Sequence, residues 1–202
     1  MSSKDTVREL LAEHGTTYAA EAGITLRDKP APLFQLLVMT VLCSVRISAE
    51  IAVKAARELF RSGWRTPHAL LDSTWQQRVD ALGRGGYRRY DESTATYLAE
   101  DARLLVDRYQ GDLRKLRDEL DGDPHAIRER LTEFARIGPV GAEIFCREAQ
   151  AVWPQLRPSF DRRALDAAGK AGLPTDPAAL ATLVPAQDLA RLAAALVRRS
   201  VR

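Results

Sequence analysis

Two short stretches of the sequence combine residue types that could do chemistry. The first, "RIGPVGAEIFCRE" (136–148), places two glycines and a proline within 138–141, between two helical patterns. Such a bare turn lets a partner approach the backbone closely, because glycine has no Cβ. The second, "RPSFDRRALDAA" (157–168), places Asp161 directly before a helical pattern. Its carboxylate could serve a reaction or simply cap the helix.

The glycine-containing turn predicts an anion-binding site. The helix after the turn presents free N–H groups and the positive end of its dipole, which suits a phosphate. Pro139 has no N–H, so we expect the donors at Val140, Gly141 and Ala142, with Gly138 allowing close approach. The alternative is an ordinary pair of helices whose glycines only permit close packing.

The elements that must position these residues are all helical. Helical periodicity runs along the chain, no run alternates like a strand, and we expect an all-α protein of roughly ten helices. "PLFQLLVMTVLCS" is apolar on every side, which predicts a buried central helix opened by Pro32. Ser48 is the expected cap of the next helix, and Gly111 should interrupt a long one.

Composition indicates an ordinary globular protein. The 202 residues, 46% of them hydrophobic and 28% charged, suit one domain or two small ones with a shared core. No apolar run is long enough to span a membrane. The N-terminal "MSSKDTVREL" lacks an apolar signal core, so we expect a cytoplasmic protein, associated with the nucleoid if it is bacterial.

Charge and metal-ligand content narrow the possible partners. Cys43 and Cys146 are too few for an iron–sulfur cluster, and the three histidines show no metal spacing, so neither a metal nor a cofactor is expected. The formal charge is +3, and arginine far outnumbers lysine. Arginine suits phosphate binding, although a GC-rich genome produces the same bias.

Ile137-Gly138-Pro139-Val140-Gly141 resembles the hairpin of the helix-hairpin-helix DNA glycosylases, the superfamily of endonuclease III. The family hairpin reads leucine-proline-glycine-valine-glycine, so proline replaces its first glycine here, beside a displaced glycine. Asp161 follows Glu143 by 18 residues, which matches the family interval to the catalytic aspartate. With the upstream core helix and a glycine-tyrosine turn, the resemblance spans residues 30 to about 172.

The resemblance implies a two-subdomain helical fold with an active-site cleft between the subdomains. Residues 1–29 and 146–202 would together form the subdomain that carries the catalytic Asp161. Residues 30–145 would form a barrel-like helical subdomain that ends in the hairpin. The likeness also makes the hairpin a candidate site for a monovalent cation.

The implied activity is base excision from DNA. Asp161 would stabilise the oxocarbenium-like sugar or activate water. Glu143 stands where strand-cleaving relatives carry a lysine, and glutamate cannot form a Schiff base. The resemblance therefore implies a monofunctional glycosylase that hydrolyses the N-glycosidic bond without cutting the strand. The structural alternatives are a simple N-cap for Asp161 and a favourable first-turn acid for Glu143.

Two loops would contact the DNA around a flipped base. Arg46 falls where the family often has a plugging glutamine, in "CSVRISAE". Tyr87 and Arg88 lie in "GRGGYRRY", where basic residues alternate with tyrosines and suit phosphate contact and stacking. The alternative is a solvated basic loop whose tyrosines pack inward.

The expected partner is double-stranded DNA that contains a lesion, with an alkylated base as one candidate. We expect a monomer without membrane contact and without an iron–sulfur cluster. Two other functions fit the sequence: a helix-hairpin-helix protein that binds DNA structures but has lost the chemistry, and a helical interaction protein with no nucleic-acid role.

Overall fold

The computed structural model describes residues 2–200, and in that range every regular element is a helix. The prediction of an all-α protein is confirmed. Thirteen α-helices and two short 3-10 helices occur between Ser2 and Ser200: α1 (Ser3–His14), α2 (Tyr18–Glu21), α3 (Pro30–Cys43), α4 (Ala49–Arg61), α5 (Pro67–Leu71), α6 (Trp75–Arg84), α7 (Asp91–Tyr109), α8 (Leu113–Glu119), α9 (Pro124–Leu131), α10 (Pro139–Ala149), η1 (Pro154–Leu156), α11 (Arg162–Lys170), α12 (Pro177–Ala181), η2 (Ala186–Asp188) and α13 (Leu189–Ser200).

Local sequence signals set most helix boundaries. The Ser48 hydroxyl accepts a hydrogen bond from the Ile51 N–H at 3.3 Å and caps α4, as its position predicts. α7 ends at Gln110 and Gly111, both with positive φ, which confirms the expected interruption. One boundary differs: α3 begins at Pro30 rather than at Pro32, because proline is also favourable in the first helical position.

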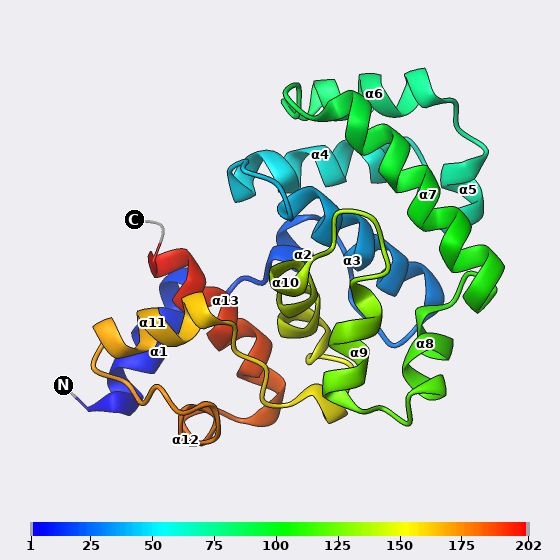
Figure 1. The fold of residues 1–202 in the computed structure, drawn as a ribbon. Coiled ribbons are helices and arrows are strands. Elements are labelled where there is room, and N and C mark those ends of the chain that lie inside the picture. The colour runs from blue at the N-terminus through cyan, green and yellow to red at the C-terminus, as the bar shows by residue number, and fades with distance from the viewer. Residues whose placement is uncertain (1, 201–202) are drawn as a thin grey trace.

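α3 is the central helix of the molecule. Its buried residues run without a break from Leu36 to Leu42, so water reaches it on no side, in agreement with its apolar sequence. In Figure 1, α4 lies above α3, and α8, α9 and α10 lie below it. α3 packs against α4 and α10, and it also meets α7 and α8.

The two ends of the chain pack together. α13 contacts α1, α11 and α10, and Figure 1 shows the blue N-terminal and red C-terminal helices side by side. Arg191 and Arg198 near the C-terminus donate hydrogen bonds to the carbonyls of Gly15 and Thr16, both at 3.1 Å. This arrangement is compatible with the subdomain of residues 1–29 and 146–202, whose boundaries stay a prediction.

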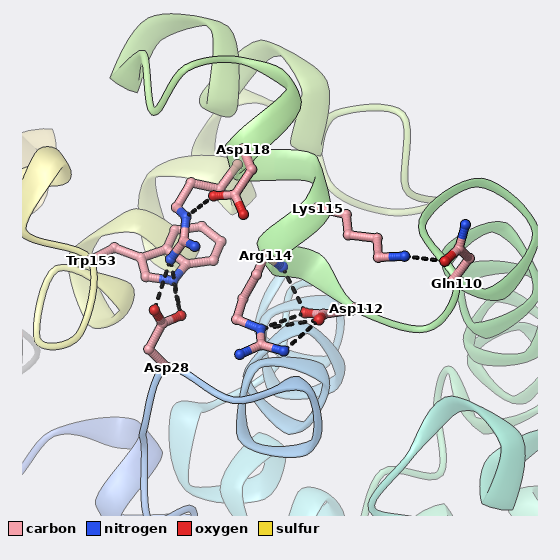
Figure 2. Close-up of polar contacts among 8 residues, drawn as sticks. Asp28, Gln110, Asp112, Arg114, Lys115, Asp118 and Trp153 are labelled. Carbon is pink, nitrogen blue, oxygen red and sulfur yellow. Dashed lines mark hydrogen bonds and ion pairs between the residues drawn. The ribbon is translucent and has the colours of Figure 1, made fainter.

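The linker before α3 is held in place by bonds to two other parts of the molecule. Figure 2 shows the Asp28 carboxylate next to the Trp153 indole, and the same carboxylate pairs with the Arg117 guanidinium of α8. Arg117 Nη1 lies 3.0 and 2.9 Å from the two Asp28 oxygens, and Trp153 Nε1 donates to Oδ1 at 2.9 Å. Trp153 is fully buried. These bonds tie the linker to α8 and to the segment after α10.

Between Ser2 and Ser200, none of the helices combines the length and apolar character that a membrane span requires.

Candidate nucleic-acid interface and active site

The hairpin leaves the N-terminus of α10 exposed. Gly138 is its N-cap, with extended backbone (φ −88°, ψ −172°) and no side-chain cap, and Val140 beside it is 70% exposed. Val140 and Gly141 occupy the second and third helical positions, whose N–H groups have no acceptor within the helix. These two N–H groups are the candidate anion donors.

Ala142 corrects the expected donor set. Its N–H donates to the Gly138 carbonyl at 2.9 Å and its side chain is buried, because the first intrahelical hydrogen bond already forms at this residue. The predicted site therefore keeps two of its three N–H donors.

The two hairpin glycines are needed for different reasons. A Cβ at Gly138 would meet nothing within 4 Å, so this glycine leaves the turn open to an approaching partner. A Cβ at Gly141 would lie 2.8 Å from Ser44 Oγ and 3.2 Å from Ile137 Cγ2. Gly141 therefore allows α10 to pack against the end of α3, which is the close-packing alternative. The open turn and the close packing coexist in one hairpin.

Arg46 and Arg88 are exposed in two loops, between α3 and α4 and between α6 and α7. Tyr87 corrects the prediction of a DNA contact: its side chain is fully buried, and its hydroxyl donates to the Leu42 carbonyl at 3.0 Å. Burial also raises the pKa of Tyr87. The alternative in which the loop tyrosines pack inward is therefore correct for Tyr87. Its ring packs inside the protein, and its hydroxyl has an acceptor at the end of α3.

Arg136 is an exposed basic residue beside the hairpin that was not predicted from the sequence. It lies two residues before Gly138, has a left-handed backbone (φ 66°), and places its guanidinium 4.6 Å from the centre of the Tyr97 ring. The sequence signal was a basic residue directly before the hairpin. The cation–π contact holds this charge beside the turn.

Asp161 is both a helix cap and a buried carboxylate. Its Oδ1 accepts the Ala164 N–H at 2.8 Å, and its Oδ2 accepts a hydrogen bond from Arg147 Nη1. The residue is only 8% exposed. The cap interpretation of Asp161 is confirmed, and the same two bonds fix the direction of the carboxylate.

Arg147 is the second residue that the sequence reading missed. It lies on α10, is buried, and meets Asp161 on one side and Glu148 on the other, with Nε 3.8 Å from Glu148 Oε1. Glu148 is also buried, and its Oε2 accepts the Ala19 N–H at 2.9 Å. Burial raises the pKa of Glu148, and Arg147 and that N–H act in the opposite direction. An arginine among apolar positions of a helix was the available signal.

Glu143 is half-buried and is the fifth residue of α10, in its second turn, so the alternative of a first-turn acid is wrong. It lies on the same helix as Arg147, four residues nearer the hairpin, so it shares the Arg147 side of α10. A carboxylate at this position has no amine with which to attack a sugar.

Below the hairpin lies a buried carboxylate with one free oxygen. Asp101 Oδ1 accepts the Ala135 N–H at 2.6 Å, whereas Oδ2 has no hydrogen-bond partner among residues 2–200. Burial raises the pKa of Asp101 from its ordinary value of 3.8 to about 8, although the Ala135 N–H lowers it. At neutral pH the protonated, uncharged form of Asp101 therefore predominates in the folded protein.

This raised pKa predicts a pH-dependent stability that Asp101→Asn should remove. The folded state retains a proton that the unfolded chain releases, so the contribution of Asp101 to stability is greatest at low pH and falls as the pH rises from about 4 to about 8. The amide keeps an acceptor for the Ala135 N–H and carries no charge. We expect the variant to exceed the wild type in Tm above about pH 8 by several degrees, since 1 kcal/mol shifts Tm by roughly 2–4 °C. Parallel Tm curves from acid to alkaline pH would contradict this assignment.

The residues present do not fit an iron–sulfur cluster. Four thiolates are needed, and the chain has only Cys43 and Cys146, at the end of α3 and within α10. Burial raises the pKa of each thiol to about 12. Within residues 2–200, no group of three or more His, Cys, Asp or Glu side chains is placed to hold a metal ion.

Two solved structures share the fold. One is a trapped covalent endonuclease III–DNA intermediate, an estranged-adenine complex, with a TM-score of 0.51, and the other is a non-covalent endonuclease III–DNA complex, with a TM-score of 0.53. Each is 18% identical in sequence, over 98% of this chain and 85% of the other. No family model and no curated protein matches the chain. The similarity establishes an endonuclease III-like fold.

Proposed function

We propose that this chain is a monofunctional DNA glycosylase that removes a damaged base from duplex DNA by hydrolysis. The observation that carries the proposal is the placement of two features on α10. Its N-terminus is the open hairpin, and Arg147 on the same helix holds Asp161. One rigid helix thus joins a phosphate site to a fixed carboxylate. The similarity to two endonuclease III structures that contain DNA supports this proposal.

DNA binding would centre on the hairpin and its basic neighbours. The N–H groups of Val140 and Gly141 would receive a backbone phosphate, and a monovalent cation at the turn is compatible with this role. Arg46, Arg88 and Arg136 are exposed, and we assign the insertion beside a flipped base to Arg46. The protein would act as a monomer.

This interface predicts a duplex affinity that falls steeply with salt. Each neutralised phosphate contributes about −0.9 to the slope of log K against log salt concentration, so three or more contacts should give a slope near −3 or steeper. Fluorescence anisotropy with an undamaged duplex at several salt concentrations measures this slope. An affinity that does not change with salt would favour a helical interaction protein instead.

The chemistry would rest on Asp161 and on water. As the sugar becomes positively charged, a fixed carboxylate beside it stabilises the developing oxocarbenium ion. Glu143 supplies no amine, so no covalent sugar intermediate forms through that position and the abasic strand stays intact. An alkylated base, whose bond to the sugar is already weakened, is one candidate substrate.

A second candidate function has a specific observation in its favour. Both oxygens of Asp161 are engaged, and the buried Arg147 neutralises its charge. A carboxylate held in this way offers little negative charge to a sugar. A neutralised Asp161 is sufficient for a protein that binds DNA structures without cutting the glycosidic bond. An assay of base release distinguishes the two functions.

A further inference from the structure

Arg147 faces two buried carboxylates but is bonded to one of them. Its Nη1 donates to Asp161 Oδ2, whereas its Nε lies 3.8 Å from Glu148 Oε1. Among residues 2–200, neither this Nε nor this Oε1 has a hydrogen-bond partner. A buried donor and a buried acceptor of opposite charge are costly when left unpaired. Their position opposite each other is the feature that requires an explanation.

Both carboxylates are anchored by backbone N–H groups. Asp161 Oδ1 accepts from Ala164 at 2.8 Å, and Glu148 Oε2 accepts from Ala19 at 2.9 Å. The guanidinium lies at the end of a flexible side chain, 5.4 Å from the centre of the Tyr18 ring. Arg147 is therefore the member of the cluster that can move.

We propose that Arg147 is a positioning residue that exchanges between two hydrogen-bonded positions, one on Asp161 and one on Glu148. In the first position it neutralises Asp161. In the second, its Nε–H bonds Glu148 Oε1 and the bond to Asp161 Oδ2 is broken, so that this oxygen faces the sugar. This inference rests on the proposed glycosylase function, and it explains how a neutralised carboxylate becomes available when damaged DNA occupies the site.

The exchange keeps the positive charge of Arg147 paired with a carboxylate throughout. Arginine does not lose its proton in proteins, so a buried guanidinium always needs a carboxylate partner. A typical N–H···O bond is about 2.9 Å long, so the Nε atom has to approach Glu148 by only roughly 1 Å. Without Glu148, releasing Asp161 would leave Arg147 as an unpaired charge in the protein interior.

The variant Glu148→Gln tests the exchange. Its amide oxygen can still accept the Ala19 N–H, but the charge that attracts Arg147 is lost. We expect single-turnover base release to fall roughly tenfold or more, in line with a hydrogen bond between charged groups, while duplex affinity stays at the wild-type value. In an Asp161→Asn background the substitution should lower the rate of base release no further, because Arg147 then has no carboxylate to release. The Tm of this double variant is measured beside its rate, since Arg147 is then left without a carboxylate partner.

Glu21→Gln is the matched control. Glu21 also pairs with an arginine, Arg198, whose guanidinium lies 4.1 Å from the centre of the same Tyr18 ring, and within residues 2–200 no hydrogen bond or ion pair joins either residue to Asp161. This variant should keep the wild-type rate. Arg147→Lys is a second test, because an ammonium group cannot reproduce the Nε and Nη1 pair, and it should lower the rate as Glu148→Gln does.

A measurement independent of activity follows Arg147 directly. The NMR signal of its Nε–H should move to lower field when the protein binds a duplex that carries an abasic-site analogue, and it should not move in Glu148→Gln. A wild-type rate in folded Glu148→Gln, or an Arg147 signal that DNA leaves unchanged, would overturn the exchange. If the wild type binds DNA but releases no base, the glycosylase proposal fails by itself, and the NMR titration still decides whether Arg147 moves.

Discussion

Replacing Asp161 with asparagine is expected to lower the rate of base release by about 100-fold or more, the usual loss when one electrostatic partner of a transition state is removed. The amide can still cap α11 through the Ala164 N–H, but it offers no negative charge to the oxocarbenium ion. Duplex affinity should stay the same or increase, because a negative charge leaves the binding site. Single-turnover kinetics and equilibrium binding on the same lesion-containing duplex separate the two effects.

The stability of this variant has to be measured as well. Removing one partner of a buried ion pair costs roughly 3–5 kcal/mol when no other partner is near, and Glu148 close to Arg147 should reduce that cost. Asp176→Asn is the matched control, since Asp176 caps α12 through the Ala179 N–H at 2.8 Å and has no ion pair with Arg147. Full activity in folded Asp161→Asn would exclude Asp161 as the catalytic carboxylate. Asp166, which lines a hollow of about 480 Å³ with Lys170, would then be the next candidate.

Gly138→Asp is expected to weaken duplex binding by at least about tenfold. Two like charges about 4 Å apart repel by roughly 1 kcal/mol in water and more near a protein surface, and about 1.4 kcal/mol corresponds to a factor of ten. The fold should not suffer, because a Cβ at Gly138 meets open space and aspartate is a favourable N-cap. Anisotropy titrations with an undamaged duplex give the affinity.

Gly138→Asn is the control for this variant, since asparagine has nearly the same shape and caps a helix equally well but carries no charge. It should bind DNA more tightly than Gly138→Asp, because both side chains obstruct the open turn alike and only aspartate adds a negative charge. The same test at Gly141 would be ambiguous, because any side chain there meets Ser44 and disturbs the packing of α10 on α3. Equal affinities of the aspartate and asparagine variants would show that no DNA phosphate binds at the hairpin.

The features that could be predicted from the sequence depend on local signals. The hairpin, the Ser48 cap and the cap at Asp161 each follow from residue types a few positions apart, and the structure contains all three. The burial of the central helix α3 could also be predicted from the sequence, because a run that is apolar on every side leaves no face for water.

The features that could not be predicted depend on contacts between distant segments. Tyr87 is buried because its hydroxyl reaches Leu42, which is 45 residues earlier in the chain. Arg147 on α10 donates to Asp161 at the start of α11, and Glu148 accepts the N–H of Ala19, which lies 129 residues earlier in the chain. No periodicity encodes such pairings, so the loop contact of Tyr87 was wrongly predicted and the charge cluster around Asp161 was missed.

The most direct test of the proposed glycosylase is base release from a panel of duplexes, each with a different lesion, followed by alkali to cut the abasic strand. We expect the wild type to produce an alkali-dependent break with at least one lesion, no break without alkali, and no covalent adduct on addition of borohydride. No release from any lesion would contradict the proposal and leave a DNA-binding protein without this chemistry. A borohydride-trapped adduct would show that an amine elsewhere in the protein attacks the sugar, since Glu143 has none.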